Sequence, residues 1–162
     1  MIKAGAATET EMKERKDLLE DALHATKAAA QEGVVIGGGV VFLRCIPEIE
    51  KAKSKVKGDE KIGFDILCGA LKAPTCQIVD NGGLEGDVVV EELIEKGGNI
   101  GFDANSGEYV DMFKAGIIDP AKVARTALQN AASVAGLMLT TKVVITDLKE
   151  DDKKNAVHGA VI

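Results

Sequence analysis

Hydrophobic residues recur with a helical period along the first part of the chain, between two recognisable helix boundaries. Thr8 is followed three positions later by Glu11, which is the spacing of a capping box and predicts a helix start. Gly33 stands where a C-terminal helix cap belongs. The apolar positions between these boundaries are Met12, Leu19, Ala22, Leu23 and Ala29. The pattern predicts one long helix over Thr10 to Gln31.

Four shorter helices are predicted in the middle of the chain, separated by glycine and proline. Their ranges are Gly39 to about Lys53, Asp59 to Lys72, Thr75 to Asn81 and Asp87 to Lys96. Proline lacks the N–H that a helix interior needs. We therefore expect Pro47 to kink or restart the first of these helices, and Pro74 to separate the second from the third. Gly97 and Gly98 should end the last one.

The last third of the chain combines an irregular segment with one more long helix. Residues 101–118 mix turn residues with aromatic and β-branched ones, which predicts short strands and turns. Asp119 is predicted to cap a helix that has Pro120 at its first position and runs to about Thr140. Residues 142–148 alternate like an edge strand, and residues 149–162 are expected to form a flexible tail. The expected fold is mainly α, with a few short strands.

Composition limits the kinds of function that fit. The chain has 162 residues, enough for one domain, and 46% are hydrophobic but only 3% aromatic, so we expect an aliphatic, alanine-rich core. A net charge of −6 argues against a nucleic-acid surface, which needs a basic stripe. The longest apolar stretch, around Val34 to Leu43, is interrupted by glycines and too short to span a membrane, and no signal peptide is recognisable.

The cysteines and histidines indicate neither a disulfide framework nor a metal site. Cys45, Cys68 and Cys76 form no Cys-x-x-Cys pair and have no histidine cluster beside them. Their plain interpretation is reduced thiols in a cytosol-like compartment. His24 and His158 lie far apart in the sequence, so a histidine-based triad is not indicated.

Four polar features could carry chemistry, and each has an ordinary structural alternative. Asp21 lies inside the first predicted helix, where a carboxylate is usually a solvated surface group. The triplet Gly37–Gly39 is either a flexible turn or a place where backbone amides approach an anion at a helix N-terminus. Asp103 suits a simple turn. Asp119 is explained by capping, or else accepts hydrogen bonds from a sugar hydroxyl or a base. The residues alone leave these alternatives open.

Several blocks of sequence closely resemble the group I chaperonins, the 60 kDa family of the GroEL type. The blocks are residues 5–16, 20–29 (EDALHATKAA), 32–39, 116–128, 131–137 and 144–148. They follow one another in order from Ile2 to about Leu148, which makes the resemblance far more specific than one motif. The fold that it implies is multihelical, like the chaperonin equatorial domain, with one long helix of the intermediate domain.

The resemblance also implies domain boundaries and site residues. Residues 1–32 would be a segment of the intermediate domain, and residues 33–148 the C-terminal part of the equatorial, nucleotide-binding domain. Asp21 matches the carboxylate that positions or activates the water that attacks the γ-phosphate of ATP. Gly37 and Gly38 match the glycines near the nucleotide, Asp103 and Ala104 match the loop at its base and ribose, and Asp119 matches a carboxylate that contacts the nucleoside. Asp103 stands where some members have asparagine.

The resemblance implies that the chain is part of an ATP-dependent molecular chaperone that assists protein folding. ATP and Mg²⁺ would be the cofactors of the parent protein, and neither is expected to bind tightly to this chain alone, because the phosphate loop and the metal-binding aspartate are not in it. The implied partners are other subunits in stacked rings and, through the absent apical domain, a co-chaperonin and unfolded polypeptides. The implied compartment is the bacterial cytoplasm or an organelle matrix. The alternative is a truncated, non-enzymatic helical module that docks on chaperonin subunits.

Overall fold

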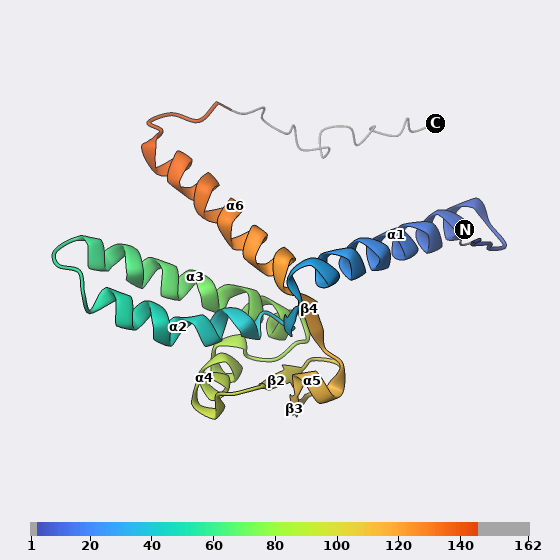
Figure 1. Ribbon diagram of the computed structural model, residues 1–162, viewed down its shortest axis with the longest axis horizontal. Helices are drawn as coiled ribbons and strands as arrows, with labels where there is room; N and C mark the ends of the chain where they lie inside the picture. Colours follow the sequence, from blue (N-terminus) through green and yellow to red (C-terminus); the bar gives the residue numbers. More distant parts are fainter. Residues whose placement is uncertain (1–2, 146–162) are drawn as a thin grey trace, which may run out of the picture. The chain divides into compact units, whose positions relative to one another are not determined.

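The computed structural model describes residues 3–145, which form helices joined by short turns and a few short strands (Figure 1). The helices are α1 (Glu9–Glu32), α2 (Val40–Lys53), α3 (Glu60–Asn81), α4 (Gly86–Lys96), α5 (Met112–Ala115) and α6 (Ala121–Thr140). The strands are β1 (Val34–Ile36), β2 (Ile100–Asp103), β3 (Glu108–Asp111) and β4 (Ile118–Pro120). The chain divides into two units, Met1–Ala127 and Leu128–Ile162, and the boundary falls inside α6. The predicted mainly α fold is confirmed.

Helix α1 begins and ends where the sequence predicts. The side chain of Thr8 accepts a hydrogen bond from the backbone N–H of Glu11 at 3.2 Å, which satisfies one of the free amides at the helix start. Gly33 ends the helix with φ of +81°, and its N–H donates to the carbonyl of Ala29. None of the α1 side chains is buried. The ends of α1 are thus set by local sequence, whereas its sides leave room for contacts with other groups.

The core of the first unit lies between α2, α3 and α4. Helices α2 and α3 lie side by side, and α4 packs against both (Figure 1). The buried cluster comprises Ile36, Val40, Leu43, Val79, Val89, Val90, Leu93, Phe102 and Met112. It is mostly aliphatic, as expected, with Phe102 as its one aromatic member, but it contains no alanine. The prediction of an alanine-rich core is therefore wrong, because leucine, valine and methionine bury more apolar surface per residue.

Pro74 does not divide its helix as predicted, and α2 does not restart at Pro47. Pro47 lies inside α2, and Pro74 lies inside α3, which continues from Glu60 to Asn81 as one helix. The predicted break at Pro74 is wrong because the buried stripe of α3 runs across it. Leu71 on one side of Pro74 and Thr75 and Val79 on the other all face the core, and each is about 2% exposed or less. Packing along this stripe outweighs the missing hydrogen bond of one proline.

A two-stranded antiparallel pair connects the end of α1 to the start of α6. In this pair Val35 of β1 lies opposite Asp119 of β4, and Val34 lies opposite Pro120. The pair is extended at one end by Ala121, whose N–H donates to the carbonyl of Gly33 at 3.0 Å. The prediction that Asp119 caps α6 is therefore wrong: pairing with β1 holds Asp119 in a strand, and α6 begins at Ala121.

The segment after α4 contains short strands and turns, as predicted, and also the short helix α5, which was not predicted. Strands β2 and β3 pair antiparallel, with Phe102 opposite Tyr109, and the two rings meet edge to face with centroids 5.4 Å apart. An edge strand was predicted over residues 142–148. Of this segment the structure describes residues 142–145, and these four residues do not form a strand. Residues 146–162, which include the rest of that segment and the predicted tail, lie outside the described residues.

Helix α3 is long and apolar enough to cross a membrane by length and composition alone. The core helix of a globular domain passes the same test. In α3, Lys72 pairs with Glu91 of α4 at 2.6 Å, and Asp65 pairs with Lys53 of α2. These contacts and the buried stripe that faces the core hold one side of α3 against α2 and α4.

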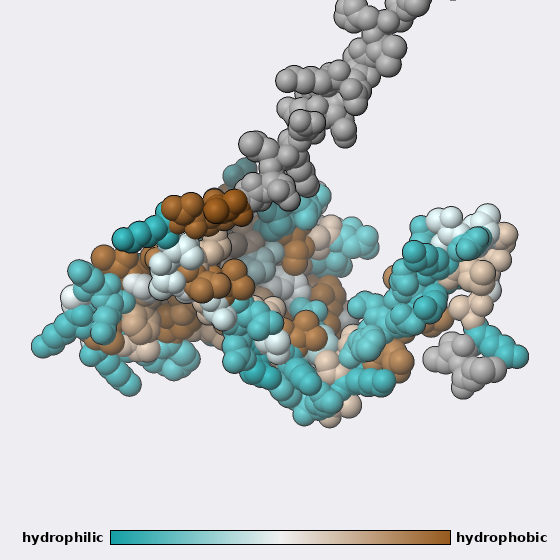
Figure 2. All heavy atoms as spheres, turned by 90° about the horizontal axis from the view of Figure 1, so that it is seen from above, coloured by the Kyte–Doolittle hydropathy of each residue, from teal (hydrophilic) through white to brown (hydrophobic). Residues whose placement is uncertain are grey.

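Aliphatic side chains lie exposed on the second unit. Leu137, Met138 and Leu139 in α6 are 68%, 63% and 87% exposed, and Val143 and Ile145 beyond the helix are exposed too. Hydrophobic patches are also visible between hydrophilic ones in the space-filling view (Figure 2). Such residues are normally covered in a stable domain.

Candidate functional site

A groove of about 820 Å³ in the first unit is lined by two of the predicted site residues, Asp21 and Asp119. Asp21 comes from α1 and Asp119 from β4. The other lining residues are His24, Ala25, Lys27, Ala28, Gln31, Pro120, Lys122, Val123, Thr126 and Ala127. The structure thus brings together two carboxylates that are remote in the sequence, within a space of the size that small-molecule ligands occupy.

The face of α1 that lines the groove has a polar end and an apolar middle. At about 100° per residue, Ala25 and Ala28 lie within about 40° of Asp21 around the helix axis. Both alanines are half-buried, whereas Asp21 is exposed. Small side chains here keep the groove open beside the carboxylate.

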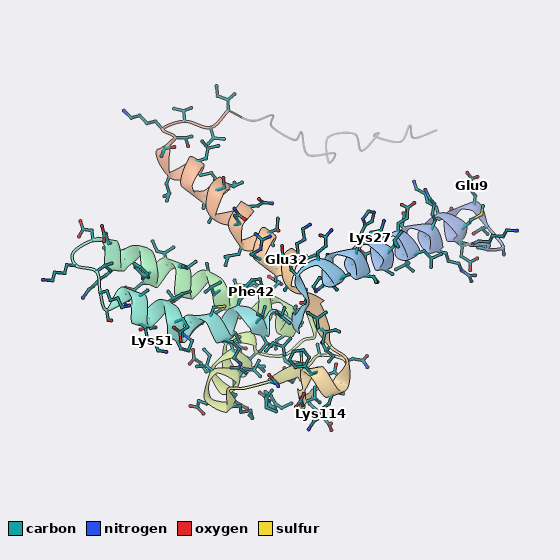
Figure 3. The ribbon with its side chains drawn as sticks, in the orientation of Figure 1. Glu9, Lys27, Glu32, Phe42, Lys51 and Lys114 are labelled. Atoms are coloured by element: carbon teal, nitrogen blue, oxygen red, sulfur yellow. The ribbon has the colours of Figure 1, made fainter. Side chains whose placement is uncertain are left out.

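The end of α1 is tied to α6 next to this groove. Arg125 donates two hydrogen bonds to the carboxylate of Glu32, from Nη2 to Oε1 at 2.8 Å and from Nε to Oε2 at 3.0 Å. Lys122 donates to the side-chain oxygen of Gln31 at 2.5 Å. Glu32 lies at the C-terminal end of α1, beyond Lys27 on the same helix (Figure 3). These contacts join the C-terminal end of α1 to the first turns of α6.

Asp119 is a half-buried carboxylate on strand β4 that lines the groove. Burial raises its pKa above the ordinary value. Within the described part of the chain its side chain makes no hydrogen bond or ion pair. A carboxylate in this condition is available to accept hydrogen bonds from a ligand in the groove.

The glycine triplet is a tightly packed turn between β1 and α2. The N–H of Gly37 donates to the carbonyl of Ile117 at 3.0 Å, and the carbonyl of Gly38 accepts from the hydroxyl of Thr75 at 3.2 Å. Gly39 has φ of +74°, and a Cβ there would lie 2.9 Å from the Thr75 hydroxyl oxygen. In the described part of the chain, the amides of Gly38 and Gly39 donate no hydrogen bond. The turn is held firmly, next to the strand that carries Asp119.

Asp103 and Ala104 lie in the β2–β3 hairpin and do not line the groove. Asp103 accepts hydrogen bonds from the backbone N–H of Asn105 and the hydroxyl of Ser106, both at 2.9 Å. These bonds, that from Asn105 first, lower the pKa of Asp103. Ala104 is exposed at the turn. These hydrogen bonds explain Asp103 as a turn residue, which was the structural alternative to a binding role in the sequence analysis.

Several groove residues were missed by sequence reasoning. His24, Lys27, Lys122 and Thr126 bring donors to a groove that already has two carboxylates. One signal could have found His24, because it stands three positions after Asp21 and so one helical turn away on a neighbouring face. No sequence signal links Lys122 or Thr126 to Asp21, because their segment reaches α1 through long-range contacts, the β1–β4 pairing and the α6 side chains bound to Gln31 and Glu32.

Similarity to known proteins extends over nearly the whole chain. The model of the TCP-1/cpn60 chaperonin family matches residues 1–149. Chaperonin GroEL from Holospora obtusa is 52% identical over 166 residues, which cover 98% of this chain and 30% of that protein. The crystal structure of a group III chaperonin in the open state matches with a TM-score of 0.79 at 33% identity, over 87% of this chain and 30% of that one.

The chain thus spans about 30% of the length of these relatives. The match confirms both the resemblance seen in the sequence and the multihelical fold that it implies. With a family model over nearly the whole chain and a relative 52% identical, the chain belongs to the TCP-1/cpn60 chaperonin family.

Proposed function

We propose that this chain contributes part of the ATP site of a chaperonin that uses ATP to assist protein folding. The observation that carries the proposal is that Asp21 and Asp119 line one groove of about 820 Å³. The two carboxylates come from separate elements, so the groove can change shape if α1 moves. A site of that kind suits an enzyme that couples a chemical step to a conformational change.

In this proposal Asp21 is the hydrolysis carboxylate. It orients a water molecule for attack on the γ-phosphorus of ATP and accepts a hydrogen bond from that water. The new bond joins the water oxygen to phosphorus, and the bond from phosphorus to the β,γ-bridging oxygen breaks. The bond electrons leave with ADP, and the products are ADP and inorganic phosphate. The exposure of Asp21 in the groove leaves its carboxylate accessible to that water.

The remaining predicted residues bind the nucleotide rather than act on it. Asp119, half-buried and without a partner among the described residues, accepts a hydrogen bond from a nucleoside hydroxyl. The free amides of Gly38 and Gly39 at the start of α2 face phosphate or sugar oxygens, with Gly37 holding the turn against Ile117. Residues Asp103 and Ala104 are proposed to border the base and ribose from the hairpin.

ATP and Mg²⁺ belong to the complete protein in this proposal. No group of three or more His, Cys, Asp and Glu side chains among residues 3–145 could hold a metal ion. When bound, Mg²⁺ would neutralise phosphate charge, and this chain would supply the water-orienting and nucleoside contacts beside it. We propose ring subunits, a co-chaperonin and unfolded polypeptides as partners, and the bacterial cytoplasm or an organelle matrix as the compartment.

A second candidate function is a helical module that docks on chaperonin subunits without catalysis. The exposed aliphatic side chains of Leu137, Met138 and Leu139 favour it, since such a surface suits burial against another polypeptide. The two candidates differ in what Asp21 does. A docking module has no use for a water-orienting carboxylate.

The proposal can be tested in a chimeric subunit in which the full 162-residue chain replaces the matching region of the Holospora obtusa chaperonin. We expect this chimera to hydrolyse ATP and Asp21→Ala to slow hydrolysis by about 100-fold or more, with little loss of nucleotide affinity. Asp17→Ala is the matched control, because Asp17 lies on the same helix but does not line the groove. Equal rates for Asp21→Ala and the parent chimera would favour the docking module. Hydrolysis by the isolated chain that depends on Asp21 would contradict the expectation that it is incomplete.

A further inference from the structure

We propose that His24 contacts the terminal phosphate of the nucleotide and makes the groove favour ATP over ADP. This inference rests on the nucleotide role proposed for Asp21 and Asp119, and it adds a residue that determines specificity within the same groove. It is carried by the place of His24 on α1, by its free ring and by the charges around it.

His24 lies beside the hydrolysis carboxylate. Three residues of an α-helix rise about 4.5 Å and turn about 300°, so His24 lies one turn from Asp21 and about 60° around the axis. Both side chains line the groove. Lys27 lies six residues from Asp21, about 9 Å along the axis and about 120° around it. Of the donors that α1 brings to the groove, His24 is therefore the nearest to Asp21.

The imidazole of His24 is available for a ligand. It is exposed, and it makes no hydrogen bond or ion pair with any residue in the described ranges. Lys122, a cation that faces the groove from α6, is already bound to Gln31 at 2.5 Å. The ring of His24 can thus turn toward a phosphate without first breaking a contact.

A hydrogen-bond donor at the position of His24 would offset the negative charge of the two carboxylates in the groove. Asp21 and Asp119 are both carboxylates, and each repels the phosphate that must come close for hydrolysis. An imidazole N–H donates to a phosphate oxygen whether or not the second nitrogen carries a proton. Because His24 lies next to the carboxylate that orients the attacking water, the phosphate it can reach is the terminal one. ADP lacks that group and would lose the contact.

The test measures the dissociation constants of Mg-ATP and Mg-ADP in the chimeric subunit that contains the full chain. We expect His24→Ala to weaken ATP about tenfold and ADP less than twofold. His24→Gln keeps an N–H donor and should recover part of the ATP affinity. His158→Ala is the matched control, because His158 is the other of the two histidines in the sequence and should leave both affinities unchanged.

Other outcomes separate this inference from the function on which it rests. Equal weakening of ATP and ADP by His24→Ala would overturn the phosphate contact, as would unchanged binding of both. If Asp21→Ala stops hydrolysis while His24→Ala has no effect, the ATP-site proposal stands and the role of His24 falls. If the parent chimera binds neither nucleotide, both proposals fall.

Discussion

Arg125 of α6 holds the carboxylate of Glu32, the last residue of α1, through two parallel hydrogen bonds of 2.8 and 3.0 Å. The next residue, Gly33, leaves the helix with φ of +81° and accepts a hydrogen bond from Ala121. The contact therefore lies beside the point where the chain turns from α1 into β1. It couples the helix that carries Asp21 to the helix that borders the groove on its other side.

We predict that Arg125→Gln loosens this junction. The N–H of Ala121, which donates to Gly33, should exchange faster with solvent, because the end of α1 loses its side-chain anchor. Hydrogen exchange followed by NMR measures this directly. Arg15→Gln is the control, since it breaks an ion pair with Glu11 at the other end of α1. Unchanged exchange at Ala121 in Arg125→Gln would show that the backbone pairing alone holds the junction.

The same contact should depend on pH. Arg125 lowers the pKa of Glu32 below its ordinary value, chiefly through its hydrogen bonds. A lowered pKa means that the stabilisation is fully present above the unfolded-state value, about 4.3 for glutamate, and is lost as the pH falls through the lower folded-state value. Exchange at Ala121 in the parent chain should accordingly approach that of Arg125→Gln only below about pH 4. A difference between the two that does not shrink as the pH is lowered below the unfolded-state value would contradict this explanation.

Arg44 is predicted to be a main support of the α4 end. Its guanidinium donates to the carbonyls of Leu93, Gly97, Gly98 and Ile100 at 2.7 to 3.2 Å. Arg44→Met leaves these acceptors without their charged donor, and we expect a loss of about 2–3 kcal/mol in the free energy of unfolding.

Chemical denaturation measures that loss, and two further variants interpret it. Arg44→Lys keeps the charge but not the planar fork of donors, so it should fall between the parent and Arg44→Met. Lys51→Met, on the exposed part of α2, should change stability by less than about 0.5 kcal/mol. If Arg44→Met behaves like Lys51→Met, solvent replaces the arginine at these carbonyls.

Gly39 and Gly58 form a matched pair that separates backbone strain from steric clash. Both have positive φ, +74° and +70°, but a Cβ on Gly39 would meet Thr75 at 2.9 Å, whereas a Cβ on Gly58 would meet nothing within 4 Å. We expect Gly58→Ala to cost about 1 kcal/mol from conformation alone. Gly39→Ala should cost at least about 2 kcal/mol more, because Thr75 is buried in α3 and cannot move away. Equal unfolding midpoints for the two variants would show that the glycine turn is not tightly packed.

Local sequence signals predicted the positions of the helices well. They did not predict how the helices and strands pack against one another. Thr8 and Gly33 set the ends of α1 because their side chain and backbone act within one turn. The break expected at Pro74 was wrong, since a buried stripe on both sides of it overrides one lost hydrogen bond. Asp119 was misassigned because aspartate followed by proline is a strong local signal for a helix start. Its pairing with Val35 of β1 is a long-range contact that no local signal reveals.

The candidate site shows the same limit. The sequence resemblance pointed to Asp21 and Asp119, and the structure places both in one groove. It did not single out His24, because the spacing of three residues from Asp21 gains meaning only once both side chains are seen to line the groove. The role proposed for His24 depends on the groove, whose lining combines α1 with β4 and α6.

Asp119 offers a last prediction, in which stability and binding move in opposite directions. Burial raises the pKa of Asp119, and no partner in the described ranges compensates. With a raised pKa, the folded chain is favoured most below the unfolded-state value, about 3.9, and loses stability as the pH rises through the folded-state value. Asp119→Asn removes the charge and should therefore stabilise the chain at pH 7 by about 0.5 kcal/mol, a modest amount because the group is only half-buried.

The gain should vanish near pH 3, where Asp119 is protonated in the parent chain as well. Unfolding midpoints at pH 7 and pH 3 measure this, with Glu108→Gln as the control because Glu108 is exposed on β3. In the chimeric subunit the same Asp119→Asn change should weaken nucleotide binding about tenfold, because a neutral amide is a poorer acceptor for a nucleoside hydroxyl than a carboxylate. An uncompensated carboxylate lowers stability. We expect a chain to retain one where the carboxylate binds a ligand. If Asp119→Asn stabilises the chain and leaves nucleotide binding unchanged, Asp119 has no part in the site.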